Sequence, residues 1–231
     1  MTSIGEGAFT GHPYNTIVVD SNNTVYDSRN NCNAVIETST NILKVGSKNT
    51  IIPEDVVSIA PHAFTKSELE SISIPASVET ISSDAFEGCA MFKEYLVHSD
   101  NTMYSSIDGV LYNKNQSALL SIPNKVTSIN VPDTCLTIEG TAAGNTSLTT
   151  FNTGNGVESI PTEMFNGCTN LTEITLGENV SDVNDLFDYV VPEVVNLNAV
   201  NVSVSTQGVI GIQNLNIGPN VEAIPTNLIR I

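Results

Sequence analysis

Residues 69–89 read LESISIPASVETISSDAFEGC, and their pattern of apolar residues indicates the fold most clearly. It contains an alternating apolar pair, a proline and further apolar positions at regular steps: Ile72, Ile74, Pro75, Val78, Ile81, Ala85 and Phe86. The same order returns in residues 171–183, LTEITLGENVSDV, and in residues 215–224, LNIGPNVEAI. Self-similarity at a fixed period of about 20 to 50 residues indicates a repeat architecture.

The second apolar residue of each alternating pair gives one anchor per repeat. Six of the eight intervals between anchors span 20 to 23 residues, and the other two span 33 and 34. Two repeats therefore carry inserts, at about 20–48 and about 98–127. The anchors are Val19, Ile52, Ile74, Val97, Val131, Thr153, Leu176, Leu197 and Ile217.

The two inserts share sequence, because residues 23–28, NTVYDS, resemble residues 101–106, NTMYSS. Asp108-Gly109 follows the second of these and is a strong signal for a two-residue turn between strands. We expect a β-hairpin in each insert.

A bulky side chain recurs at one position of the repeat. A solenoid fills its interior in this way, since each unit buries its apolar face only against its neighbours. We expect nine stacked short strands, each followed by a turn and then by a single helical turn at the Ala-Phe pair. The recurring residues are Phe9, Phe64, Phe86, Phe165 and Phe187.

The strand pattern, proline turn, Ala-Phe pair and Gly-Cys of residues 69–89 closely resemble the BspA-like leucine-rich repeats of surface proteins from oral and gut bacteria and some parasitic protists. The sequence YSSIDGVLY at 104–112 is similar to that family's recurrent interruption. The resemblance implies an arc-shaped leucine-rich-repeat solenoid of the α/β class, β-rich with short helical turns. It would have about nine repeats of 20–23 residues, two of them with β-hairpin inserts. It further implies one domain over 1–231, truncated at its N-terminus.

The charge balance limits the partners. The chain has 8 Lys+Arg against 25 Asp+Glu, a formal net charge of −17. Nucleic acid is bound chiefly by clustered cations, so we expect no nucleic-acid partner, and an anionic membrane surface is disfavoured for the same reason. No apolar run reaches the roughly 20 residues of a membrane span, so we expect no membrane insertion. We also expect a monomer.

The cysteines show no metal-like spacing. Strands about 4.8 Å apart would hold Cys89 and Cys168, several repeats apart, beyond disulfide reach. Cys135 takes the place of Val78 in its repeat, and Cys32 lies in an insert. We expect four free, mostly buried thiols.

The sequence offers no catalytic constellation. His12, His62 and His98 lie far apart, and none has a neighbour at metal-ligand or nucleophile spacing. Common catalytic motifs are missing, so we expect no catalytic residue, no metal and no cofactor. Asp182, Asn184, Asp185 and Asp188 loosely resemble a calcium loop but lack its glycine and distal glutamate. A solvated acidic loop is the favoured interpretation, and calcium binding there stays open.

A partner would contact the outward side chains of the strands. Small polar groups dominate these positions, and two explanations remain: side-chain ladders that stabilise the stack, or a flat polar platform for a protein or glycan. Tyr26, Tyr104 and Tyr112 in the inserts are the aromatic candidates. The strand-face candidates are Ser71, Ser73, Glu94, Asn130, Asn152, Glu173, Thr175, Asn196 and Asn216.

The resemblance implies a non-catalytic binding or adhesion module, surface-exposed or secreted, that recognises a host or extracellular protein or glycan. The alternative is a structural spacer or scaffold within a larger surface protein. An enzyme is the least supported class, because a continuous solenoid offers no obvious cleft for paired titratable groups.

Overall fold

The computed structural model describes residues 2–5, 7–9, 11, 14–183, 186–203 and 212–224. They belong to two compact units, Met1–Gly109 and Val110–Ile231, which are described separately. His12, Asn184 and Asp185, which the sequence analysis considered, lie outside the described residues.

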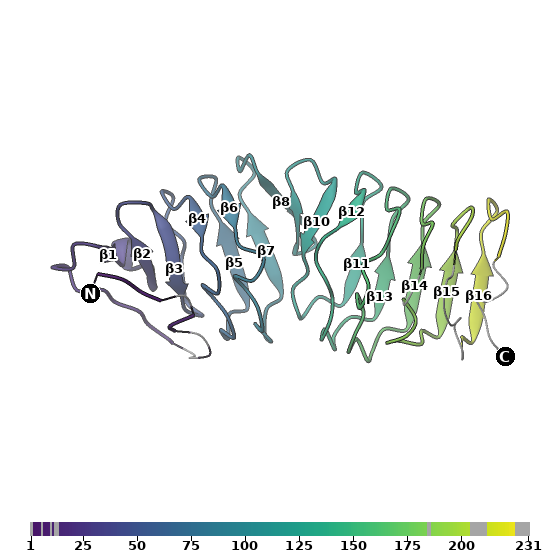
Figure 1. Cartoon of the computed structure of the whole chain (residues 1–231), viewed down its shortest axis with the longest axis horizontal. Coiled ribbons are helices and arrows are strands. Elements are labelled where there is room, and N and C mark those ends of the chain that lie inside the picture. The colour runs from purple at the N-terminus through teal and green to yellow at the C-terminus, as the bar shows by residue number, and fades with distance from the viewer. Residues whose placement is uncertain are drawn as a thin grey trace. The chain divides into compact units, whose positions relative to one another are not determined.

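Short parallel strands form at the alternating apolar pairs, and we call these the front strands. In the first unit β5 pairs with β7, and Ile72 lies opposite Tyr95. In the second unit five strands pair in the order β11-β13-β14-β15-β16, side by side in Figure 1. The front strands are β5 (Ser71–Ile74), β7 (Glu94–Val97), β11 (Ser128–Asn130), β13 (Thr150–Asn152), β14 (Glu173–Leu176), β15 (Val194–Leu197) and β16 (Asn214–Ile217).

A second, shorter set of strands follows the turn in some repeats, and we call these the back strands. They are β4 (Ser58–Ile59), β6 (Thr80–Ile81) and β12 (Thr137–Ile138). β4 and β6 pair in parallel in the first unit. Isolated parallel bridges continue this arrangement in the second unit, from Ser159 to Asp182 and from Asp182 to Ser203.

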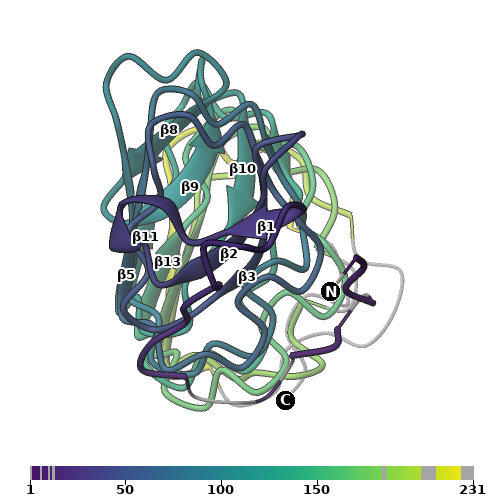
Figure 2. The same cartoon turned by 90° about the vertical axis from the view of Figure 1, so that its left-hand side faces the viewer.

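The first insert contains β1 (Tyr26–Asp27), a short 3-10 helix η1 (Arg29–Asn31), β2 (Ala34–Glu37) and β3 (Ile42–Gly46). β2 pairs antiparallel with both β1 and β3, and Figure 2 shows these strands near the viewer. The predicted hairpin is confirmed. β3 then pairs in parallel with back strand β4, so the insert continues the back of the stack.

The second insert contains β8 (Tyr104–Ile107), β9 (Val110–Asn113) and β10 (Ala118–Ser121). Asp108 and Gly109 both have positive φ, as the predicted tight turn requires. β9 and β10 form an antiparallel hairpin, and β10 pairs in parallel with back strand β12. β10 thus has the same role in the second unit as β3 has in the first.

The interior follows the predicted columns except at Phe9, which is 36% exposed. Ile72, Ile74 and Val78 are at most 2% exposed. The rings of Phe64 and Phe86 stack 4.9 Å apart with 4° between their planes, as the phenylalanine column predicts. In the second unit Phe165 packs edge-on against Phe151 of β13 instead.

The predicted helical turns are wrong, because η1 is the only helix among the described residues. The segments at the Ala-Phe pairs are single turns closed by i to i+3 bonds, such as Ala85 N to Ser82 O. Positive φ at His62, Gly88 and Glu163 is incompatible with a continuing right-handed helix in these segments. The molecule is a β-solenoid.

The nine predicted strands are also too many, since seven front strands form among the described residues. Val19 and Ile52 lie in no strand. Val19 packs against Tyr26, Val35 and Val45 of the first insert. The N–H of Ile51 donates to the carbonyl of Cys32, also in that insert. Contacts with the insert replace a front strand in this region.

Candidate functional site

The front strands present the predicted binding residues in register. In the first unit Ser71 lies opposite Glu94, and Ser73, two pairs further along and opposite Leu96, is also exposed. In the second unit two columns form: Ser128, Thr150, Glu173, Val194 and Asn214, and Asn130, Asn152, Thr175, Asn196 and Asn216. Asn130 and Asn216 are exposed, whereas Asn152, Glu173, Thr175 and Asn196 are half-buried.

Hydrogen bonds connect neighbouring side chains along these columns. Asn196 Nδ2 donates to Glu173 Oε1 at 2.7 Å and to Thr175 Oγ1 at 2.9 Å. Asn216 Nδ2 donates to Asn196 Oδ1 at 2.7 Å, and Thr150 Oγ1 donates to Ser128 Oγ at 2.7 Å. The side-chain ladders that could stabilise the stack are therefore present. They also hold the side chains in fixed positions, which lowers the entropy that a partner would lose on binding.

In the first unit the outward position just before the anchor residue carries apolar groups, which the strand-face candidates leave out. Val18, Ile51 and Leu96 occupy this position in the first unit and are 83%, 73% and 48% exposed. Their signal in the sequence was an apolar residue at a position where most repeats carry a small polar one. They are further candidates for contact with a partner.

The prediction of an exposed aromatic site is wrong for two of the three insert tyrosines. Tyr26 and Tyr112 are 3% and 1% exposed, because strands β1 and β9 turn these rings into the core. Tyr104 is half-buried, and its hydroxyl oxygen accepts a bond from the N–H of Ile81 at 3.0 Å. Burial raises the pKa of the Tyr104 hydroxyl.

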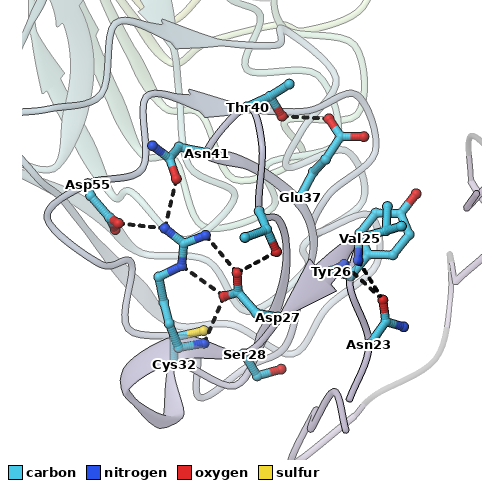
Figure 3. Close-up of polar contacts among 12 residues, drawn as sticks. Asn23, Val25, Tyr26, Asp27, Ser28, Cys32, Glu37, Thr40, Asn41 and Asp55 are labelled. Carbon is cyan, nitrogen blue, oxygen red and sulfur yellow. Dashed lines mark hydrogen bonds and ion pairs between the residues drawn. The ribbon is translucent and has the colours of Figure 1, made fainter. Parts of the chain in front are cut away.

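A polar network holds the first insert in place (Figure 3). Arg29 donates from Nε and Nη2 to both carboxylate oxygens of Asp27, at 2.8 and 2.7 Å. Its Nη1 donates to Asn41 and to the carboxylate of Asp55 in the following repeat. The Arg29 hydrogen bond lowers the pKa of Asp27 to about 2. Because these donors are already engaged by protein acceptors, the network is structural.

The cysteines and His62 are titratable groups outside this network. All four cysteines are free and buried, as predicted. His62 Nε2 lies 3.4 Å from Asp84, and Nδ1 lies 3.7 Å from Glu87, so its two nitrogens face different carboxylates. Within the described part of the chain, no group of three His, Cys, Asp or Glu side chains could hold a metal. Nor does that part contain a helix able to cross a membrane.

Stacked parallel strands at a period of about 22 residues, with hairpin inserts, define the class as a leucine-rich-repeat solenoid. The model of the BspA type leucine rich repeat region matches residues 43–132 and 123–209, in six copies. The chain therefore belongs to this family, which confirms the resemblance seen in the sequence. No curated protein matches it.

Several solved structures are similar to this chain, and PcpA, with a TM-score above 0.5, shares its fold. The pneumococcal vaccine antigen PcpA is 24% identical with a TM-score of 0.55, and the match covers 76% of this chain and 45% of that one. A leucine-rich repeat protein from Bacteroides ovatus is 15% identical over 90% of this chain and 78% of its own, with a TM-score of 0.45. A leucine rich cell surface protein from Faecalibacterium prausnitzii is 22% identical over 71% of this chain and 52% of its own, with a TM-score of 0.38. The chain thus spans less than half of PcpA.

Proposed function

We propose that this protein is a non-catalytic binding module, displayed on a bacterial surface or secreted, that recognises an extracellular protein or glycan through its front strands. Membership of a family of leucine-rich repeat surface proteins supports this proposal. The expectations of one continuous domain and of a monomer remain part of it.

The front face of the second unit gives the main support for the proposal. Its five strands present two columns in register, and no Lys, Arg or Asp lies in either column. Amide and hydroxyl groups can donate and accept hydrogen bonds, as a polar protein or glycan surface requires. Ladder bonds fix several of these groups before any partner arrives.

The test combines a binding screen with matched variants. The whole chain is screened by surface plasmon resonance against extracellular matrix proteins and a glycan array. Asn130→Arg places a bulky cation on the exposed front face, and Thr137→Arg places one on an exposed residue of back strand β12. We expect the first to weaken binding about tenfold or more, equivalent to about 1.4 kcal/mol, and the second to leave binding unchanged. Absence of any ligand, or loss of binding in the Thr137 variant alone, would overturn the proposal.

A structural spacer is the second candidate, and the ladders favour it because they satisfy front-face groups without a partner. A spacer would bind nothing in the screen. Asn130→Arg would then leave the display of any attached domain unchanged.

A further inference from the structure

The second unit contains two Asn-Gly pairs, Asn155-Gly156 and Asn166-Gly167. In such a pair the glycine amide nitrogen can attack the asparagine side-chain carbonyl carbon, because glycine has no Cβ to obstruct it. The two pairs have the same chemistry, so their surroundings in the fold decide their rates.

Asn166-Gly167 is open to this reaction. Both residues are exposed, and the Asn166 side chain has no hydrogen-bond partner among the described residues. A Cβ placed on Gly167 would meet only Gly144, at 3.4 Å, so the turn has room to deform. Solvent bases can reach the Gly167 N–H, and the Asn166 amide is free to rotate toward it.

Asn155-Gly156 is protected from this reaction. The Asn155 Oδ1 accepts a bond from Glu178 N at 3.2 Å, whereas the Asn166 side chain accepts none among the described residues. The main-chain N–H of each asparagine is bonded, to Asp133 Oδ1 at 2.8 Å for Asn155 and to Glu163 O at 3.0 Å for Asn166, so these bonds do not distinguish the two pairs. Gly156 is buried, and a Cβ placed on it would collide with the carbonyl oxygens of Asp133 and Cys135. The side chain is held, and backbone from the preceding repeat encloses the glycine.

We propose that Asn166 is a site of spontaneous deamidation in the folded protein. The Gly167 nitrogen loses its proton to a solvent base and forms a bond to Asn166 Cγ. The bond from Cγ to Nδ2 breaks, and ammonia leaves. Water then opens the resulting five-membered imide at one of its two carbonyl carbons, which gives aspartate or isoaspartate. No oxidant or reductant is needed.

The modification acts on a contact between repeats. The carbonyl oxygen of Asn166 accepts a bond from Gly144 N at 2.7 Å. Isoaspartate routes the main chain through the former side chain, which lengthens it by one atom and displaces this acceptor. Each event also adds one carboxylate to a chain whose formal net charge is −17.

The experiment incubates the whole chain in mildly alkaline buffer and follows both pairs by peptide-mapping mass spectrometry. We expect Asn166 to deamidate several-fold faster than Asn155 in the folded protein, and the two rates to converge in denaturant. Asn166→Gln removes the fast site. Asn155→Gln is the matched control and should leave the rate at Asn166 unchanged.

Equal rates in the folded wild-type protein, or a faster rate at Asn155, would overturn the proposal. This comparison needs no variant, so it remains decisive if either variant fails to fold. A protein methyltransferase specific for isoaspartate should label residue 166 in the aged chain, and absence of label beside the mass shift would leave aspartate as the product.

Discussion

Asn101 and Asn145 make the same four hydrogen bonds, one residue in each unit. Both are 0% exposed. Each Nδ2 donates to two carbonyl oxygens of an earlier repeat: Pro75 and Val78 for Asn101, and Pro123 and Val126 for Asn145. Each Oδ1 accepts two N–H groups just downstream: Met103 and Tyr104, and Ser147 and Leu148. One buried amide thus joins two repeats with its hydrogen-bonding capacity filled.

Asn145→Ala is expected to destabilise the protein by at least about 2 kcal/mol, because a buried group left without a partner costs about 1–3 kcal/mol. The variant leaves the Pro123 and Val126 carbonyls and two N–H groups without this partner. Urea unfolding measures the loss.

Asn170→Ala is the matched control, since Asn170 is exposed and makes one side-chain bond, to Thr146 O. A change within about 0.5 kcal/mol is typical of surface substitutions. If both variants lose the same stability, the buried amide is not the cause.

Gly46→Ala is expected to cost about 1–3 kcal/mol or more, as overpacked cores do. An added Cβ at Gly46 would overlap the ring of Phe64, which is itself stacked on Phe86. Gly5→Ala provides the comparison, because a Cβ there meets nothing within 4 Å. Thermal unfolding of the two variants measures the difference, and equal melting temperatures would refute the packing argument.

The cysteines are expected to resist thiol reagents in the folded protein at neutral pH. Burial raises the pKa of Cys89 and of Cys168 to about 11, so the reactive thiolate is scarce. Ellman's reagent should detect all four thiols after denaturation and none before it. Rapid reaction of any cysteine in the native protein would contradict the burial described here.

Asp27 is expected to make stability depend on pH below about pH 4. Its pKa is about 2 in the folded protein against an ordinary value of 3.8, so folding favours the charged form. This contribution is complete above the ordinary value and is lost as the pH falls through about 2. Unfolding curves of the wild type and of Asp27→Asn should therefore converge across that window. Parallel curves would show that Arg29 does not stabilise the carboxylate.

Most of the stack was predictable because its signal is local and periodic. Ile72, Ile74 and Val78 are buried as the alternation requires, and the Phe64–Phe86 stack follows from one column of the repeat. The front-strand candidates lie in register because repeats of nearly equal length place equivalent residues opposite one another on neighbouring strands. Whether these residues bind a partner stays a prediction.

The predictions were wrong where contacts between residues far apart in the sequence determine the local structure. Val19 has the same local pattern as Ile74, yet contacts with the first insert take the place of strand pairing. Tyr26 and Tyr112 resemble surface aromatics in sequence, and only the pairing of their strands shows that the rings are buried. The sequence similarity around Asn23 and Asn101 indicated the inserts. It did not show that the Asn101 side chain joins two repeats, because the carbonyl oxygens that it contacts lie more than 20 residues away in the sequence.

The second insert covers one edge of strand β7. Tyr95 N donates to Gly109 O, and Val97 N donates to Ser106 Oγ, so the second insert occupies the edge where another front strand would add. The two-stranded sheet of β5 and β7 is therefore a ladder of its own, and the five-stranded sheet begins anew at β11. Within the second unit, fraying of the front sheet that starts at β16 and proceeds strand by strand therefore ends at β11.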